Sequence, residues 1–111
     1  MICDRFETVV VPFPFAELPV LKRRPVVVVS SRAFNQANGA SLVAMITAAK
    51  ETRWPSDIAL SDLTAAGLLT PCILRMRLVT LPNDLILRGL GRLAPLDRLV
   101  CERGLAEMHV G

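Results

Sequence analysis

Three adjacent cations, Lys22, Arg23 and Arg24, stand directly before a proline and a run of four valines. Proline cannot donate a backbone hydrogen bond, and β-branched valines favour a strand that is buried on both faces. We therefore expect a basic loop that leads directly into a buried strand. The cations cannot follow the valines into the core unless they meet an anion, so they should lie at the rim of the fold, where they could hold a phosphate group.

Two more arginines, Arg75 and Arg77, lie two residues apart in the alternating segment 72–79. Residues i and i+2 of a strand point to the same face, so these two guanidinium groups should converge on one face of a sheet. Arginine outnumbers lysine in the chain, and its planar fork suits bidentate contacts with phosphate. Aromatic residues are scarce, with four Phe and one Trp, so an extended base-stacking platform is not expected.

The apolar and turn-forming residues predict a series of short strands. Alternating or β-branched runs indicate strands, and clusters of glycine, proline and asparagine indicate the turns between them. Two prolines in the segment 12–15 should end the first strand, because proline is excluded from the interior of a paired ladder, and residues 13–24 should then form a long loop. The expected strands span residues 6–11, 25–30, 41–47, 57–60, 72–79 and 87–93.

Two helical segments are expected in the C-terminal half. Residues 61–62 should cap a single turn that stops at Gly67, where a left-handed residue is easiest. Residues 95–110 form the best helix, because Pro95 suits a first-turn position and Asp97 complements the positive end of the helix dipole. Five or six short strands with one terminal helix predict a mainly β fold, a small SH3-like antiparallel barrel with a C-terminal helix. The apolar stripe of that helix contains Leu96, Leu99, Val100 and Ala106.

The length of 111 residues allows one domain, residues 1–111, with a single hydrophobic core. Apolar residues make up 52% of the chain, a high share at this size, so a partner or a second copy should cover part of the surface. Charges or prolines interrupt every apolar run before the roughly 18–20 residues that a membrane-spanning helix needs. The N-terminus lacks the layout of a signal peptide, and we expect a cytoplasmic protein.

Three cysteines, Cys3, Cys72 and Cys101, are widely spaced and have no neighbouring histidine. This spacing favours buried, reduced thiols over a disulfide framework or a zinc site. We therefore expect neither a bound metal nor a cofactor. The net charge of +3 is modest, so the position of the cations along the chain is more informative than their sum.

A known family shares several of these segments in the same order and spacing over nearly the whole chain. The segments are residues 6–15, 22–25 with the valines that follow, 32–35, 45–47, 54–55, 66–68 and 79–81. In them the chain resembles the MazF/PemK (Kid-like) toxins of toxin–antitoxin pairs. The resemblance implies an SH3-like barrel of the MazF/CcdB type, a homodimer, and a metal-independent endoribonuclease that a small antitoxin neutralises.

The resemblance also implies roles for individual residues. Arg24 matches an active-site arginine of the family, Thr47 matches its site threonine, and Arg75 matches the arginine that Kid-like members use beside an aspartate. Such an enzyme cleaves single-stranded RNA through attack by the ribose 2′-OH, which leaves a 2′,3′-cyclic phosphate and a 5′-OH. The two arginines would stabilise the phosphate while the threonine positions it.

The chain departs from the family pattern near these residues. Kid-like members carry an aspartate two residues after the arginine, where this chain has either Arg77 or a one-residue deletion. Ala48 replaces a serine that can follow the site threonine, and the first loop has no histidine. Arginine is a poor proton shuttle because its pKa lies above about 12, so the proton donor and acceptor are open. Glu17 in the first loop is a candidate base. Arg75 has an alternative role as a structural partner of Asp57 or Asp84.

Further residues are candidates for contact with RNA through charge and stacking. Trp54 has an equal alternative role as a cap on the barrel core, and His109 is expected to be a surface residue without a catalytic part. The expected partners are single-stranded mRNA, a second copy of the chain and an acidic antitoxin. The candidate RNA contacts are Lys22, Arg23, Arg53, Trp54 and Arg77.

Two other functions remain open on the sequence. One is a non-enzymatic toxin like CcdB, which poisons DNA gyrase by contact. CcdB-like chains end in an aromatic residue followed by glycine and isoleucine, whereas residues 108–111 read Met-His-Val-Gly. The other is a catalytically decayed relative that only binds an antitoxin, which the missing aspartate makes a reasonable alternative.

Overall fold

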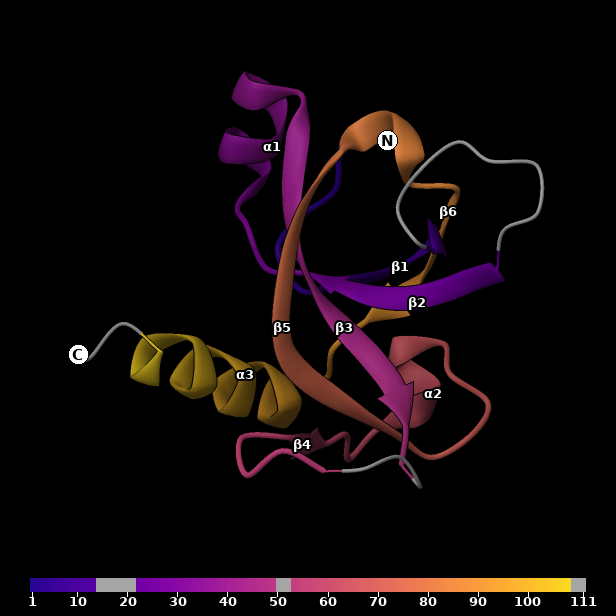
Figure 1. Cartoon of the computed structure of the whole chain (residues 1–111), viewed down its shortest axis with the longest axis vertical. Coiled ribbons are helices and arrows are strands. Elements are labelled where there is room, and N and C mark those ends of the chain that lie inside the picture. Colours follow the sequence, from indigo (N-terminus) through magenta and orange to yellow (C-terminus); the bar gives the residue numbers. More distant parts are fainter. Residues whose placement is uncertain (14–21, 50–52, 109–111) are drawn as a thin grey trace.

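The computed structural model describes residues 1–13, 22–49 and 53–108. In this part of the chain, six antiparallel strands form one sheet in the order β4-β5-β3-β2-β1-β6, which curls into a half-barrel (Figure 1). The elements are β1 (Glu7–Phe13), β2 (Lys22–Val28), α1 (Arg32–Asn38), β3 (Ala40–Ala48), β4 (Ile58–Ala59), α2 (Leu63–Ala66), β5 (Cys72–Pro82), a 3-10 turn η1 (Asn83–Leu85), β6 (Arg88–Arg92) and α3 (Pro95–Glu107). The predicted class, a small antiparallel barrel with a C-terminal helix, is confirmed.

The buried valines of β2 divide the apolar interior between the two faces of the sheet. Val26 and Val28 pack into one cluster, whereas Val27 and Val29 pack into the other, as the alternation of a strand requires. The first cluster also holds Val11 and Met45 and lies away from α3. The second contains Cys101 of α3. The single core expected from the length is therefore split into two by the sheet itself.

The cations before Pro25 lie within a strand rather than in a loop, so this part of the sequence prediction is wrong. β2 begins at Lys22, and its first residues pair with the end of β1, with Arg24 opposite Val11. β1 likewise runs through Pro12 to Phe13 instead of stopping before the proline. β6 pairs with β1 only as far as Val10. Among the described residues Pro12 therefore has no ladder partner on that side, and its missing N–H costs no hydrogen bond to them.

The turn that closes α2 has the capping that the sequence predicts. The Asp62 side chain accepts a hydrogen bond from the backbone N–H of Ala65 at 2.9 Å, and Gly67 ends the turn with φ of +72°. The backbone of this turn lies directly against β6. An added Cβ on Gly91 would sit 2.3 Å from the carbonyl oxygen of Ala65. Gly67 and Gly91 thus allow the main chains of α2 and β6 to come into contact.

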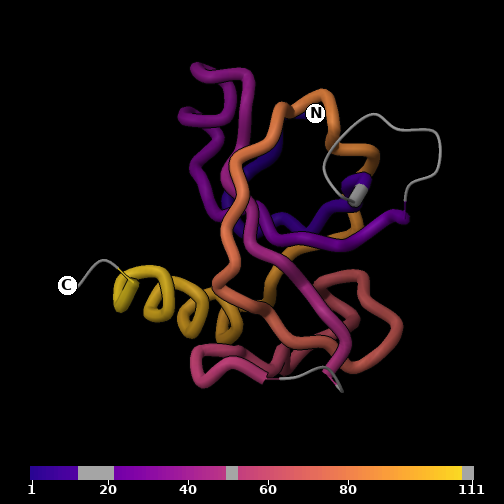
Figure 2. Tube along the Cα trace, viewed as in Figure 1, coloured from indigo at the N-terminus to yellow at the C-terminus, as the bar shows by residue number. Residues whose placement is uncertain are grey.

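α3 begins at Pro95, as predicted, but its apolar stripe does not face its own core. Leu96, Leu99 and Val100 are exposed, whereas Asp97 and Cys101 are buried. Asp97 is buried because its carboxylate accepts hydrogen bonds from the backbone N–H and the hydroxyl of Ser61, both at 2.9 Å. The helix is thus fastened at its first turn and packs on the sheet through Cys101, while its C-terminal end extends away from the strands (Figure 2). None of the helices described is long and apolar enough to cross a membrane.

Candidate active site

Three neighbouring strands carry the predicted site residues on the same face of the sheet. Val26 of β2 pairs with Met45 of β3, and Met45 pairs with Arg75 of β5, so these three residues form one row. Arg24 and Thr47 each lie two positions from a member of this row and therefore point to the same face. Arg24, Thr47 and Arg75 are all partly buried. The structure thus places three residues that are far apart in sequence on one face of the sheet.

The register places Thr47 one diagonal step from Arg75. Thr47 pairs with Ile73, two residues before Arg75 on β5. Diagonal neighbours of this kind have Cα atoms roughly 7–8 Å apart, within reach of a long side chain. On the other side, the ladder of β2 with β3 stops at Val26, next to Pro25, which lacks a backbone donor. Beyond that point the two strands diverge (Figure 1), with Arg24 on one and Thr47 on the other.

The register of β5 shifts at the site. Ala44 pairs with Leu78, whereas the next residue, Met45, pairs with Arg75. Met76 and Arg77 are therefore two extra residues that form a bulge. Met76 is buried in the core beneath α3, and Arg77 is exposed. The alternation of the strand keeps Arg77 on the same face as Arg75, as the sequence predicts.

A carboxylate does lie beside Arg75, although it comes from a different segment than the family pattern suggests. Asp57 precedes Arg75 by 18 residues and accepts hydrogen bonds from its Nε at 3.1 Å and from its Nη2 at 3.0 Å. The Asp57 side chain is 2% exposed and that of Arg75 is 16% exposed. This fork confirms the alternative in which Asp57 is the partner of Arg75. It also fixes the plane of the guanidinium.

The ion pair between Arg75 and Asp57 changes the pKa of the carboxyl group. The Arg75 guanidinium, through its hydrogen bond, holds the pKa of the Asp57 carboxyl below its usual value, against an opposing effect of burial. A carboxyl whose pKa is lowered by folding stabilises the protein fully above its unfolded pKa of about 4, and this contribution is lost as the pH falls through the folded value.

We expect Asp57→Asn to lower the free energy of unfolding at pH 7 by about 2 kcal/mol, because one partner of a largely buried pair is removed. The difference from the unmodified protein should stay constant down to about pH 5 and shrink below about pH 4, where Asp57 itself becomes protonated. Urea unfolding from pH 7 to pH 3 measures it. Asp84→Asn, at an exposed carboxylate of η1, is the control. A difference that does not change below pH 4 would contradict the assignment.

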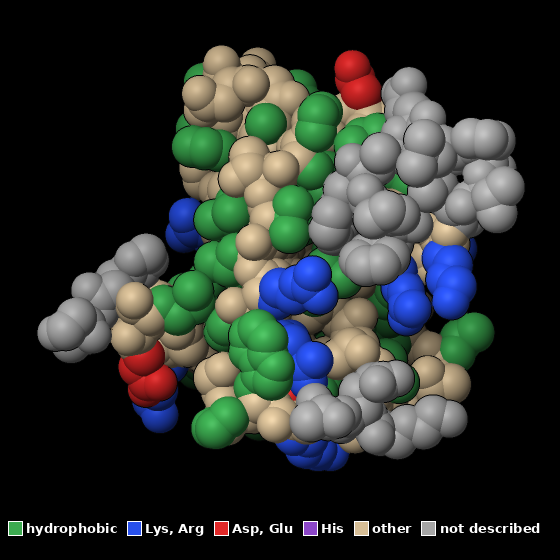
Figure 3. Space-filling view, in the orientation of Figure 1, with side chains coloured by type: hydrophobic (Ala, Val, Ile, Leu, Met, Phe, Trp, Pro, Cys, Tyr) green, Lys and Arg blue, Asp and Glu red, His purple; other side chains and the backbone are tan. Residues whose placement is uncertain are grey.

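The remaining candidate cations divide between the two sides of β2 and the loop after β3. Lys22 is exposed on the same face of β2 as Arg24, whereas Arg23 lies on the opposite face, where it pairs with Pro12. Arg53 is exposed and donates to the carbonyl oxygen of Ala49 at 3.3 Å. Figure 3 shows Lys and Arg side chains gathered over the part of the face formed by β5, β3 and β2. This face suits a polyanion.

Several predicted residues lie outside the described part of the chain. Glu17, the candidate base, and His109 are among them. Trp54 is described and is 43% exposed, with its ring over the guanidinium of Arg75, so it does not cap the barrel core. Asp57 was foreseen only as one of two structural partners of Arg75. The sequence signal for it was slight, a single acidic residue just after the loop that follows β3.

Comparisons with known proteins identify the family and the fold of this chain. A family model described as PemK-like, MazF-like toxin of type II toxin–antitoxin system matches residues 4–109. No curated protein sequence matches the chain significantly. Among solved structures, an endoribonuclease in complex with its cognate antitoxin from a mycobacterial species is similar with a TM-score of 0.75 at 20% identity, covering 98% of this chain and 97% of that one.

Two further structures have the same fold. A complex of MazE and MazF from Deinococcus radiodurans gives a TM-score of 0.77 at 16% identity, over 97% of this chain and 96% of that one. The toxin MazF-mt6 of Mycobacterium tuberculosis gives a TM-score of 0.72 at 16% identity, over 91% of this chain and 93% of that one. At such identities the structures show the shared fold, and the family match over almost the whole length shows the relationship. The chain therefore belongs to the PemK-like, MazF-like toxins of type II toxin–antitoxin systems.

Proposed function

We propose that this toxin is a sequence-selective, metal-independent endoribonuclease that cleaves single-stranded mRNA. The observation that carries the proposal is the placement of Arg24, Thr47 and Arg75 on the same face of three neighbouring strands. Two guanidinium groups and a hydroxyl can bind and polarise a phosphate diester. Two similar structures from mycobacterial species, an endoribonuclease in complex with its cognate antitoxin and an endoribonuclease, support the same activity.

The proposed reaction is attack by a ribose 2′-oxygen on the adjacent phosphorus. The P–O5′ bond breaks, a base takes the 2′ proton, and the leaving 5′-oxygen receives a proton, which gives a 2′,3′-cyclic phosphate and a 5′-OH. Arg24 and Arg75 stabilise the charge that develops on the phosphorane, and Thr47 positions the phosphate between them. Arginine is unsuited to proton transfer near neutral pH, so the base and the acid are not assigned to these three residues, and Glu17 is a candidate for the base.

The test is direct. Purified protein is incubated with a long RNA that lacks stable structure, in the presence of a chelator, and the cut ends are mapped. We expect discrete cuts at a preferred sequence, with 5′-OH ends that a kinase can label without prior phosphatase treatment. RNA that stays intact over a wide range of pH and salt would contradict the proposal and favour a non-enzymatic or catalytically decayed toxin.

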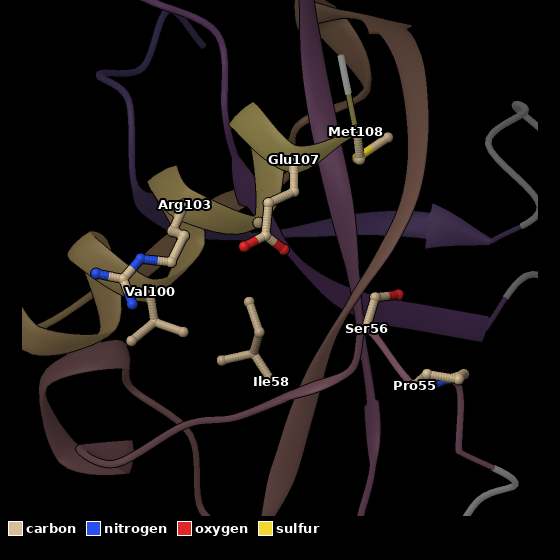
Figure 4. Close-up of a pocket in the computed structure, with 8 residues that line it drawn as sticks. Pro55, Ser56, Ile58, Val100, Arg103, Glu107 and Met108 are labelled. Atoms are coloured by element: carbon tan, nitrogen blue, oxygen red, sulfur yellow. The ribbon is translucent and has the colours of Figure 1, made fainter. Parts of the chain in front are cut away.

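We further propose that the toxin acts as a homodimer joined through the exposed face of α3. This face carries Leu96, Leu99 and Val100 together with charges of both signs, Arg103 and Glu107, so that two copies related by a two-fold axis can match each other. A hollow of about 330 Å³ lies beside it, between β4 and α3. Figure 4 shows α3 side chains reaching into this hollow. An apolar face next to a hollow suits burial against a second copy.

Leu99→Glu is expected to shift the protein to monomer at micromolar concentration, because Leu99 is 63% exposed in one copy and its replacement would bury a charge in the proposed interface. Analytical ultracentrifugation should give a molecular mass of twice 12.1 kDa for the unmodified protein and of 12.1 kDa for the variant. Leu69→Glu is the matched control, because Leu69 is exposed on the loop before β5. A Leu99→Glu protein that remains dimeric would show that another face forms the dimer.

The antitoxin that we propose is an acidic, partly disordered peptide that covers the start of β2. The cationic face formed by Lys22, Arg24 and Arg77 supports this choice, as do the antitoxin complexes of similar structures. Its affinity should fall with added salt to the extent that charge pairing contributes. Because mRNA is the proposed substrate, we place the action of the toxin in the cytoplasm.

A further inference from the structure

A large aromatic ring is left in solvent beside the candidate active site. Trp54 is 43% exposed, and one side of its indole lies against the guanidinium of Arg75, whose central carbon is 4.9 Å from the ring centroid. A cation so placed is attracted to the face of the ring. The ring is therefore supported from one side, and it keeps apolar area in contact with water.

One carboxylate holds this arrangement together. Oδ2 of Asp57 accepts hydrogen bonds from the backbone N–H of Trp54 at 2.8 Å and from Nη2 of Arg75 at 3.0 Å. Oδ1 accepts from Nε of the same arginine at 3.1 Å. Asp57 thus holds two groups in place, the backbone of Trp54 and the guanidinium of Arg75 beneath the indole. Such fixation lowers the entropy that the ring would lose on binding a ligand.

The position of the ring relates it to the phosphate-binding residues. Arg75 stands one diagonal step from Thr47 across β3 and β5, and Trp54 lies over Arg75. A nucleotide whose phosphate sits at Thr47 would have its neighbours within reach of the indole, because successive bases of an extended strand lie several ångströms apart.

We propose that Trp54 is a stacking subsite for an unpaired RNA base next to the cleaved phosphate, with Asp57 as the positioning residue that sets both the indole and Arg75. The proposal rests on the proposed ribonuclease function for its substrate class. Stacking on an indole tolerates every base, because each has a π-face, so this subsite would supply affinity and alignment rather than the sequence preference.

The chain contains a single tryptophan, so its fluorescence reports on this subsite alone. The full-length toxin is titrated with a single-stranded oligonucleotide of mixed sequence that carries 2′-O-methyl groups, which prevent cleavage. We expect saturable quenching of the emission. Binding of a labelled copy of the oligonucleotide, followed by anisotropy, gives the affinity independently and applies equally to variants without tryptophan.

Trp54→Leu should weaken binding roughly tenfold, and Trp54→Phe should restore most of the affinity, because stacking of one base on an aromatic ring accounts for such a factor. Phe34→Leu is the matched control. Phe34 is a similarly exposed aromatic residue on α1, at the opposite end of the molecule from β4 (Figure 1), and its loss should leave the affinity unchanged. Asp57→Asn should also weaken binding, while circular dichroism shows that the fold is kept.

The outcomes separate this inference from the proposed function. Binding or cleavage without quenching, or equal affinity for Trp54→Leu, would overturn the stacking subsite and leave the nuclease intact. Quenching without cleavage of unmodified RNA would support the subsite and count against the cleavage chemistry. A failure of the oligonucleotide to bind at all would overturn both.

Discussion

Arg24→Ala is expected to lower kcat/KM for RNA cleavage by about 10²- to 10³-fold. Arg24 is partly buried on β2, on the same face as Thr47 and Arg75. A cationic donor aimed at the charge that develops in a transition state typically contributes a factor of this size. Single-turnover rates on a short RNA with one mapped cut site measure it. Arg24→Lys should recover only part of the loss, because an ammonium keeps the charge without the planar fork.

Arg23→Ala is the control for this experiment. It removes the same charge from the neighbouring position, but alternation along β2 turns Arg23 toward the opposite face. We expect a change of a few-fold, as general electrostatic attraction to RNA weakens. Equal losses in the two variants would mean that the cations act through their summed charge, and the assignment of Arg24 to the site would be abandoned.

Gly91→Ala is expected to destabilise the protein by about 3 kcal/mol, the upper end of the typical range for overpacking. The added Cβ would lie 2.3 Å from the carbonyl oxygen of Ala65 and 2.9 Å from the carbonyl carbon of Ala66. Both are backbone atoms of α2, so relief requires a shift of the whole turn. Thermal unfolding should show a Tm lower by roughly 10–20 °C.

Gly89→Ala provides a matched control within the same strand. Nothing lies within 4 Å of a Cβ added at Gly89, so that its effect should be about 0.5 kcal/mol or less, with either sign. If the two variants unfold alike, the main-chain contact between α2 and β6 does not limit the packing at Gly91.

Local chemistry explains which parts of the fold are predictable from the sequence. The cap of α2 depends on Asp62 and Gly67, which lie within one turn of each other, and the burial of the valines depends on their own side chains. The start of β2 is not set by local chemistry in this way. Lys22 and its neighbours are extended because β1 pairs with them, and this partner is set by tertiary structure. The exposed stripe of α3 was misread for the same reason, since a helical pattern does not say which surface covers it.

The candidate site, like the fold, is predictable from the sequence only where local features determine it. Arg24 and Arg75 were identified by a combination of residue type and family pattern, and the register of three strands then brings them to one face. The fork from Asp57 could not be chosen over Asp84 from the sequence, because it depends on the course of the loop between β3 and β4. Contacts between distant segments are set by the way the chain folds back, which no single segment encodes.

The bulge in β5 bears on how chain length can vary within this fold. Met76 and Arg77 are two residues that the partner strand does not match. A strand alternates with a period of two, so that removal of both would keep every later side chain of β5 on its present face, whereas removal of one would turn Leu81 out of the core and Thr80 into it. Natural insertions and deletions at this point of the fold should therefore come in pairs.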